Sequence, residues 1–341
     1  MNSASLHIRH YRPEDRESLL SIKCSVFKGI VLDNERRRFQ WEIDENPIKL
    51  ADIPVAFVLQ AGDDVAGYFA FVPYRVQIGR QIVGGCTGID LCLLDRFRGS
   101  GASHQFIQSW MAPGFCAFPF ATALGSAATH LLKAAGAESL GGRLETIAYA
   151  YFVDHVHPPW KELPAHSVTG IQEFGREYDD LWDRIREHHR LILVKDALYM
   201  NWRYRDYPFE KPTLLAARDP CGTLSGIAVV QVDREFGRVY LCELLTEPGN
   251  SPARRGLLRA SVDVARSSGE KFFYYSTRDA EQVDDVLETG FEPLPGPVPT
   301  FMARVNFTPS EGPVRVQDWH TSLGDGDQLF NIGEPGKERR A

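Results

Sequence analysis

Residues 90–110 read Asp90-Leu-Cys-Leu-Leu-Asp-Arg-Phe-Arg98-Gly-Ser-Gly-Ala-Ser-His-Gln-Phe-Ile-Gln-Ser-Trp110. An apolar run typical of a strand ends at Arg98-Gly-Ser-Gly101 and passes directly into an amphipathic segment. The first N–H groups of a helix have no partner inside it, and the helix dipole favours negative charge there. Gly99 and Gly101 let the backbone approach a ligand closely, and Arg98 adds a fixed positive charge. The stretch therefore predicts a strand-to-helix turn that can hold a phosphate.

Two common phosphate-binding loops do not fit this stretch. A P-loop has Lys followed by Ser or Thr after its second glycine, where this chain has Ala102-Ser103. The dinucleotide fingerprint needs three spaced glycines at the start of a βαβ unit, which this loop does not supply. The pattern that remains is Arg98-x-x-Gly101-x-Ser103, and a plain helix start after an Arg-Gly-x-Gly turn is the alternative interpretation.

The composition indicates a globular protein. The 341 residues suffice for two ordinary domains, and 43% hydrophobic with 24% charged residues are typical of soluble proteins. The net charge of −7 argues against a nucleic-acid-binding surface. No apolar run approaches the ~20 residues that span a bilayer, and the first residues lack the apolar core of a signal peptide. We therefore expect a cytoplasmic protein that binds neither nucleic acid nor membrane.

Two further features have structural interpretations. The six cysteines are scattered without a CxxC pair or metal-ligand spacing, which fits a reducing compartment and predicts no metal site. The basic run Arg36-Arg37-Arg38 is flanked by acidic residues, so we expect it on a solvated helix face.

The order of predicted elements is the same in the two halves of the chain. The first half is expected to have strands at 6–11, 54–60, 65–77, 82–94, 115–119 and 143–153, with helices from residue 13, at 102–111 and around 122–135. The second half is expected to have strands at 168–174, 212–217, 226–232, 238–245, 271–276 and 291–305, with helices at 178–189, 196–204, 252–267 and 280–288. This repeat indicates an internal duplication. We predict domains at 1–155 and 156–306, joined by a proline-bearing linker at 155–164, and a C-terminal tail at 307–341.

The pattern formed by Arg98, Gly101 and Ser103 resembles the pyrophosphate loop of the GNAT superfamily of acyl-CoA-dependent N-acyltransferases, although Ser103 replaces the usual Gly or Ala. Trp41-Glu-Ile-Asp-Glu-Asn-Pro47 and Tyr199-Met-Asn-Trp-Arg-Tyr204 resemble elements of tandem-GNAT proteins. The resemblance covers about residues 6–306. It implies an α/β (α+β) fold of two tandem GNAT-like domains, each a mixed, largely antiparallel sheet flanked by helices.

The resemblance also implies how an acyl-CoA is held. In that fold two neighbouring strands separate at a bulge, and pantetheine lies in the gap like an extra strand. A free backbone N–H near Leu93 then stabilises the oxyanion. The second half has Ser251-Pro-Ala-Arg-Arg-Gly256 at the corresponding turn, a degenerate loop that we expect to serve the acceptor side instead. The expected CoA-contact residues are Cys92, Leu93 and Leu94 for the pantetheine arm, and Arg98, Gly99, Ser100, Gly101, Ala102 and Ser103 for the pyrophosphate.

The catalytic candidates have structural alternatives. Asp90 lies in an apolar strand, where its pKa would be raised and it would serve as a base; the alternative is a strand-end residue satisfied by backbone donors. His130 lies where related enzymes place an acid, but Leu132 replaces the usual Tyr, and a partly buried helix residue is the alternative.

Candidate acceptor-contact residues are Trp41, Trp202 and Arg203. For the latter two, an amphipathic helix with aromatic anchors is the alternative interpretation.

Together these features predict an N-acyltransferase that uses acetyl-CoA or a short 3-hydroxyacyl-CoA, with no metal, to acylate a small-molecule amine. The resemblance extends to bacterial sugar N-acyltransferases of surface-polysaccharide pathways, which makes a nucleotide-linked amino sugar the expected acceptor. The alternative is a non-catalytic tandem GNAT protein that binds acyl-CoA or a protein partner.

Overall fold

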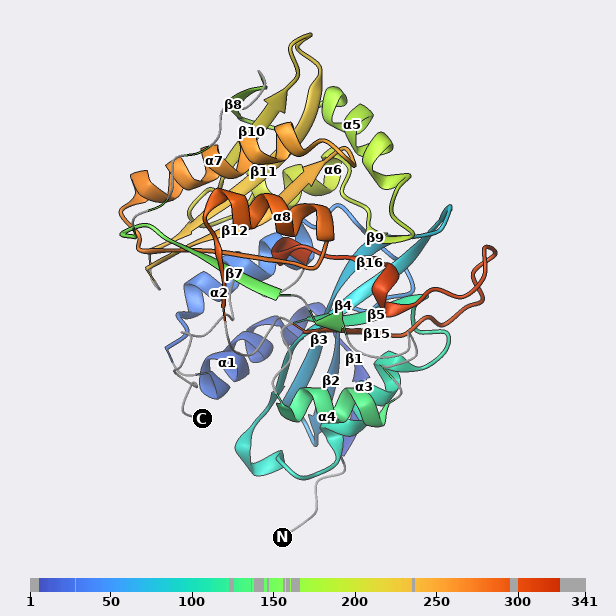
Figure 1. The fold of residues 1–341 in the computed structure, drawn as a ribbon. Coiled ribbons are helices and arrows are strands. Elements are labelled where there is room, and N and C mark those ends of the chain that lie inside the picture. The colour runs from blue at the N-terminus through green and yellow to red at the C-terminus, as the bar shows by residue number, and fades with distance from the viewer. Residues whose placement is uncertain are drawn as a thin grey trace. The chain divides into compact units, whose positions relative to one another are not determined.

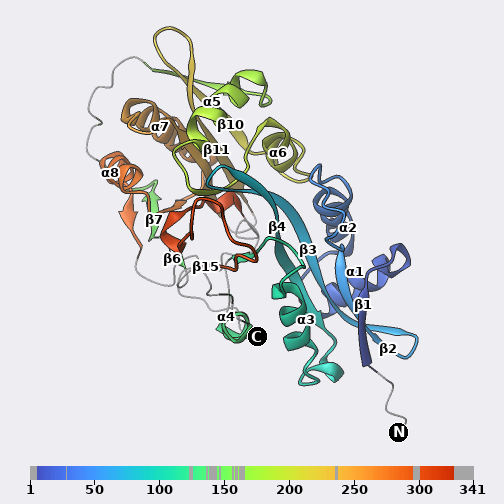
Figure 2. The same ribbon diagram turned by 90° about the vertical axis from the view of Figure 1, so that its right-hand side faces the viewer.

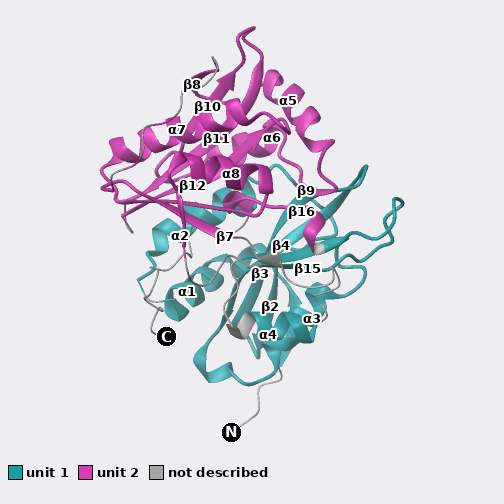
Figure 3. Ribbon diagram, in the orientation of Figure 1, with its two compact units in different colours: residues 1–143, 301–316 teal, residues 144–300, 317–341 magenta. Residues whose placement is uncertain are grey.

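The structure is a computed structural model that describes residues 6–27, 29–122, 126–135, 137, 144–145, 147–155, 157, 160, 166–234, 237–294 and 300–325. The chain divides into two compact units, residues 1–143 with 301–316 and residues 144–300 with 317–341 (Figure 3). Each unit is built on one mixed sheet, and Figure 1 labels most of the strands and the flanking helices.

The sheet of unit 1 has the strand order β1-β2-β3-β4-β5-β15. Strands β1 to β4 pair antiparallel, β5 joins β4 in parallel, and β15 is antiparallel to β5. Gly62 and Gly79 take positive φ angles in the tight turns before and after β3, a conformation that glycine adopts without strain. The strands are β1 (Leu6–His10), β2 (Ala56–Ala61), β3 (Asp64–Ile78), β4 (Gln81–Leu93), β5 (Phe118–Thr122) and β15 (Thr300–Ala303).

Helices cover both faces of this sheet (Figure 2). On one face Phe69 and Phe71 of β3 pack against Phe106 and Trp110 of α3, forming an aromatic core with ring centroids 5.3 Å apart for Phe69 and Trp110. Because side chains alternate along a strand, the neighbouring residues of β3 face the other side, where α1 packs on β3 and β4. The helical elements are η1 (Pro13–Asp15), α1 (Arg16–Val26), α2 (Leu32–Phe39), the π-helix η2 (Gln40–Asp44), η3 (Asp95–Phe97), α3 (Ala102–Met111) and α4 (Ser126–Ala134).

Unit 2 repeats this plan with the order β14-β7-β13-β12-β11-β10-β8. Strands β8, β10, β11 and β12 pair antiparallel, β13 is parallel to β12, and β7 is antiparallel to β13. The strands of this sheet are β7 (Ile147–Phe152), β8 (Ser167–Ile171), β10 (Thr213–Arg218), β11 (Leu224–Asp233), β12 (Arg238–Thr246), β13 (Phe272–Thr277) and β14 (Glu292–Pro293). The short strands β6 (Leu144–Glu145), β9 (Leu191–Leu193) and β16 (Trp319–His320) also lie within the residues of unit 2 but are not part of this sheet.

The helices of unit 2 include a π-helix at the same place as in unit 1. Asp196 caps α6 by accepting a hydrogen bond from the N–H of Tyr199 (3.1 Å), as its position before the helix predicts. The helix then continues as the π-helix η4 around Trp202, just as α2 continues as η2 around Trp41. The helical elements are α5 (Arg176–Arg186), α6 (Ala197–Met200), η4 (Asn201–Arg205), α7 (Ser251–Ser268), α8 (Ala280–Thr289) and η6 (Leu323–Asp325).

The two units differ from the predicted domains in their closing strands. We expected the strand at 143–153 to close the first half and the strand at 291–305 to close the second. Instead β7 pairs with β13 in unit 2, and β15 pairs with β5 in unit 1. A local pattern of apolar residues predicts a strand but not its partner, so the division at 155/156 missed this exchange.

The predicted tail also differs from the structure. Residues 307–316 belong to unit 1 and residues 317–325 to unit 2, where β16 pairs in parallel with β9. Trp319 is 2% exposed and Asp325 is fully buried, so this segment is part of a core. Residues 326–341 lie outside the described residues.

The predicted fold class is confirmed, since each unit has a mixed and largely antiparallel sheet flanked by helices. Among the described residues, no helix combines the length and the apolar character needed to cross a bilayer.

Candidate functional site

The turn between β4 and α3 leaves its backbone open. Gly99 has φ +80° and Gly101 φ +85°, and a Cβ atom built at either glycine has no atom within 4 Å. The first N–H of α3 to bond within the helix is that of Gln105, which donates to Gly101 O (3.1 Å). The N–H groups of Ser103 and His104 therefore precede the helical ladder and point out of its N-terminus.

The side chains of this turn add positive charge and little bulk. Arg98 is exposed and lies 3.1 Å from Asp95 through its Nε. The hydroxyl of Ser100 accepts a long hydrogen bond (3.4 Å) from the N–H of Ala102, whose own side chain is buried. Arg98, the two glycines and the N-terminus of α3 thus form one exposed surface with the charge and the open backbone that suit an anion.

The strand that leads into this turn separates from its parallel neighbour. Strands β4 and β5 pair only from Gly85–Phe118 to Thr87–Phe120, although β4 continues to Leu93 and β5 to Thr122. On its other edge β4 stays paired with β3 up to Leu93. Among the described residues, the final part of β4 therefore has no strand partner on the β5 side.

The backbone of Leu93 points to this unpaired edge. The N–H of Leu94 donates to Ala66 O (3.0 Å) in the β3–β4 ladder. In an antiparallel pair the backbone groups of successive residues alternate between the two edges, so the N–H and C=O of Leu93 face away from β3. The N–H of Leu93 can therefore act as the predicted hydrogen-bond donor to an oxyanion.

Of the predicted pantetheine-contact residues, Cys92 offers only its backbone. Its side chain is fully buried, and burial with the nearby charge of Asp90 raises the pKa of the thiol far above its ordinary value. The thiol stays protonated at neutral pH. Leu93 is 8% exposed and Leu94 is half-buried.

Asp90 lies at a bulge in β4 just before this edge. Ile89 pairs with Ala70 and Cys92 with Tyr68, so two residues of β4 oppose one residue of β3. Asp90 has φ +53° and is the one non-glycine residue with positive φ in the described part of the chain. Its carboxylate accepts a hydrogen bond from Lys23 Nζ (2.8 Å) and lies 3.8 Å from Arg38 Nη1.

These partners overturn the expected electrostatics of Asp90. Burial acts to raise its pKa, but the charges of Lys23 and Arg38 outweigh that effect and hold the pKa below its ordinary value. The expectation of a raised pKa among apolar neighbours was therefore wrong. An ionised carboxylate in two ion pairs is a weak proton acceptor, and the role of Asp90 as a base stays a prediction.

Neither cation was predicted from the sequence to contact Asp90. Arg38 is buried and bonds Glu42 (3.0 Å), so the basic run of α2 is not wholly a solvated face. Lys23 is 3% exposed and also pairs with Glu35 (2.5 Å). The burial of Lys23 could have been predicted from its position four residues after Leu19, on the apolar face of an amphipathic helix.

The other predicted site residues belong to other elements of the fold. His130 is exposed on α4, where Leu132 is buried. Trp41 is 1% exposed within η2 of unit 1. Trp202 and Arg203 are 3% and 2% exposed within η4 of unit 2. Their predicted acceptor-contact role stays a prediction, and in the structure these three side chains contribute to packing.

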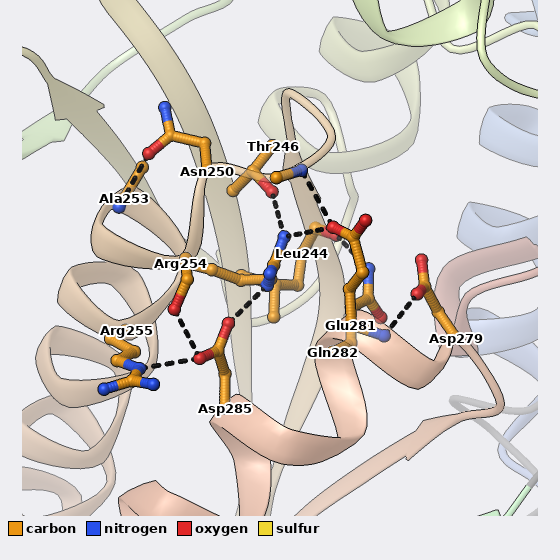
Figure 4. Close-up of polar contacts among 12 residues, drawn as sticks. Leu244, Thr246, Asn250, Ala253, Arg254, Arg255, Asp279, Glu281, Gln282 and Asp285 are labelled. Carbon is orange, nitrogen blue, oxygen red and sulfur yellow. Dashed lines mark hydrogen bonds and ion pairs between the residues drawn. The ribbon is translucent and has the colours of Figure 1, made fainter.

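The corresponding turn of unit 2 is filled by the chain's own carboxylates (Figure 4). The N–H of Gly249 donates to Glu281 Oε2 (2.8 Å), and Ser251 Oγ donates to Asp285 (2.6 Å). Arg254 and Arg255 each bond Asp285 through Nε at 2.6 Å. Carboxylates of α8 thus neutralise the charge of both arginines. They also occupy a backbone N–H of this turn, which would be available to a phosphate if the turn were open.

A metal centre has no support in the described residues, where no group of three or more His, Cys, Asp or Glu side chains is arranged to hold an ion.

No protein-family model matches the sequence, and no curated protein matches it.

Solved structures share the fold. An Enterococcus faecalis V583 protein described as a probable N-acyltransferase aligns with TM-score 0.63 and 10% identity over 89% of this chain and 72% of its own. A GCN5-related N-acetyltransferase from Anabaena variabilis aligns with TM-score 0.62 and 14% identity over 89% and 73%. Saccharomyces cerevisiae N-myristoyltransferase with bound myristoyl-CoA aligns with TM-score 0.55 and 11% identity over 93% and 87%. The fold is therefore that of GCN5-related N-acetyltransferases, and the predicted resemblance to sugar-specific enzymes stays a prediction.

Proposed function

We propose that unit 1 binds an acyl-CoA and transfers its acyl group to a primary amine. The observation that carries the proposal is the coincidence of two features at one end of β4. The strand loses its partner on the β5 side after Thr87, and it then runs into an open glycine turn at the N-terminus of α3. An extended arm ending in a diphosphate matches both features.

In this proposal the pantetheine arm pairs with the free edge of β4 as an added strand. The C=O and N–H of Leu93 are the groups available to its amides, and the pyrophosphate lies on Arg98 and the N–H groups of Ser103 and His104. The likeness in fold to a structure that contains myristoyl-CoA supports an acyl-CoA as the ligand.

The reaction is a direct transfer. The amine nitrogen attacks the thioester carbonyl, the C–N bond forms, and the C–S bond breaks to release the CoA thiolate. The nitrogen loses one proton and the thiolate gains one. A backbone N–H such as that of Leu93 stabilises the oxyanion of the intermediate, a contribution of about 3–4 kcal/mol in other acyl-transfer enzymes. The exposed imidazole of His130 remains the proposed acid, and any base must come from a group other than a fixed ion pair.

We propose a nucleotide-linked amino sugar as the acceptor class to test first, with acetyl-CoA or a short 3-hydroxyacyl-CoA as donor. Its support is the sequence resemblance of the Trp41 and Tyr199–Tyr204 segments to tandem members of the superfamily. The acidic net charge of −7 disfavours acceptors carried on RNA.

A second candidate is a protein that binds acyl-CoA without transfer. Two observations favour it: buried Leu132 stands where related enzymes have a Tyr acid, and Asp90 is held in ion pairs. This alternative predicts CoA binding with no amine-dependent release of thiol.

The experiment measures thiol release from acetyl-CoA and 3-hydroxybutyryl-CoA against a panel of amines that includes nucleotide-linked amino sugars. We expect Arg98→Ala to raise the KM for acyl-CoA about tenfold or more, since a hydrogen bond to a charged group contributes about 1.5–3 kcal/mol. Arg96→Ala is the matched control, because Arg96 is equally exposed (64% against 62%) but lies before the turn. Binding of CoA without release identifies the binder, and absence of CoA binding refutes the proposal.

A further inference from the structure

Asp90 stands out in the described residues because its backbone conformation is unfavourable for a residue with a side chain, yet it lies inside a strand. Such residues persist only where the surroundings hold them, and they concentrate at functional sites.

What holds Asp90 is a buried network anchored at both cations. Lys23 comes from α1 and is fixed by Glu35 of α2 (2.5 Å) as well as by Asp90 (2.8 Å). Arg38 comes from α2 and is fixed by Glu42 (3.0 Å). Each cation has a second carboxylate partner, so the Asp90 carboxylate is drawn to a preset position and the backbone follows it.

What the conformation achieves is a change of register. The bulge adds one residue to β4 between the pairs Ala70–Ile89 and Tyr68–Cys92. Without it Leu93, rather than Leu94, would lie opposite Ala66, and the Leu93 N–H would donate into the β3–β4 ladder. The bulge is thus the reason that the Leu93 N–H faces the unpaired edge.

Unit 2 supplies an internal comparison. Gly226 of β11 pairs with Thr246 of β12 as Gly67 pairs with Leu93, and a carboxylate lies three residues earlier in each case: Glu243 and Asp90. A bulge lies next to this carboxylate rather than at it, because Glu243 pairs with Val229 and Leu241 with Val230, which leaves Cys242 as the extra residue.

The carboxylate of Glu243 is held by a buried lysine too. Lys195 Nζ donates to it (2.8 Å), and Tyr204 Oη does so as well (2.6 Å). Lys195 also binds Asp325 (2.5 Å), and all three charged side chains are 0% exposed. A buried carboxylate held by a lysine therefore recurs in unit 2, beside a turn whose backbone and arginines are bonded by Glu281 and Asp285.

We propose that Asp90 is a positioning residue, which with Lys23 and Arg38 holds the β4 bulge and thereby aims the Leu93 N–H at the thioester, and that it is not the general base. This assignment rests on the proposed acyl transfer for its catalytic consequence. The effect of Asp90 on the direction of the Leu93 N–H follows from the register of β4 alone.

Three variants separate the two roles. Asp90→Asn keeps a polar partner for Lys23 and tolerates positive φ, Asp90→Gly tolerates positive φ without a side chain, and Asp90→Ala does neither. A positioning role predicts kcat within about tenfold of wild type and an unshifted pH profile for Asn, a fall of about 100-fold for Ala, and an intermediate fall for Gly, which permits the bulge but does not tether it to Lys23 and Arg38. A base predicts that all three lose about 1000-fold in kcat and that the acid limb of the profile disappears. That second pattern overturns the proposal.

Amide hydrogen exchange tests the same proposal without an activity assay. We expect the Leu93 amide to exchange fast in wild type and Asp90→Asn, and slowly in Asp90→Ala, where the register slips and Leu93 bonds Ala66. Equal exchange at Leu93 in all three proteins overturns the register argument. A wild-type protein that binds no CoA refutes the proposed function, while this exchange result still decides the role of Asp90. Thermal unfolding of each variant identifies any that fails to fold.

Discussion

A negative charge introduced at the start of α3 should stabilise the helix and, at the same time, weaken the binding of a phosphate to its N-terminus. Ser103 is the second residue of α3 after the cap Gly101, and it lies half-buried at the exposed turn. An aspartate there stabilises the helix dipole by about 0.3–1 kcal/mol. We therefore expect Ser103→Asp to fold normally, with a Tm unchanged or raised by about 1–3 °C.

The same charge opposes a diphosphate. At a separation of about 5 Å and an effective dielectric constant near 20, one charge repels another by about 3 kcal/mol. Screening at physiological salt reduces this to a loss in CoA affinity of about 10- to 100-fold. Ser103→Asp thus predicts weaker binding in a protein that is no less stable.

Isothermal calorimetry with CoA measures the affinity. Gln108→Asp is the matched control, since Gln108 is exposed further along α3 and its substitution makes the same change in net charge. A second control is acetyl-pantetheine, which lacks the diphosphate and should bind both variants equally. CoA binding to Ser103→Asp with wild-type affinity would refute the placement of the pyrophosphate on this turn.

Three further predictions concern stability. A Cβ at Gly67 would overlap the Leu93 side chain, so Gly67→Ala should destabilise unit 1 by about 1–3 kcal/mol in urea unfolding, and an unchanged midpoint would contradict the close approach of β3 and β4. Lys195→Met leaves Glu243 and its neighbouring carboxylate buried without a cation, and should cost about 3–5 kcal/mol; a cost below about 1 kcal/mol would show that the ion pairs are not desolvated. Burial and the charge of Lys195 lower the pKa of His189 to about 4, so the unfolded chain binds the extra proton and stability should fall by about 2–3 kcal/mol as pH drops from about 6.5 to 4. The pH dependence should be weaker in His189→Gln.

The parts of the fold that the sequence predicted are those set by local patterns. The β2–β3–β4 meander follows from alternating apolar residues and the turn glycines, and α3 begins at the residue that the Gly99–Gly101 turn indicates. The start of α6 follows from Asp196 as a cap.

The parts that the sequence missed depend on contacts between distant segments. The exchange of β7 and β15 between the two sheets depends on which strand edges meet, and a strand pattern does not encode its partner. The electrostatics of Asp90 depend on Lys23, which lies 67 residues earlier in the chain. A lysine on the apolar face of α1 signals a buried partner, but not which carboxylate it meets.

The turns before α3 and α7 have corresponding positions in the two units, but the first is open and the second is closed by side chains. The first presents free helix N–H groups and Arg98 to solvent. In the second, Asp285 of α8 accepts hydrogen bonds from Ser251 and Arg254. Carboxylates of the neighbouring helix α8, together with the cap Asn250 of α7, thus account for the closed state of the second turn.

The most direct test of the account is amide hydrogen exchange across the whole chain with and without saturating CoA. We predict protection at residues 91–94 and 101–104, where the unpaired edge of β4 meets α3, and none at residues 249–255 of unit 2. Protection confined to unit 2, or no change at the β4–α3 turn, would contradict the claim that unit 1 holds the acyl-CoA.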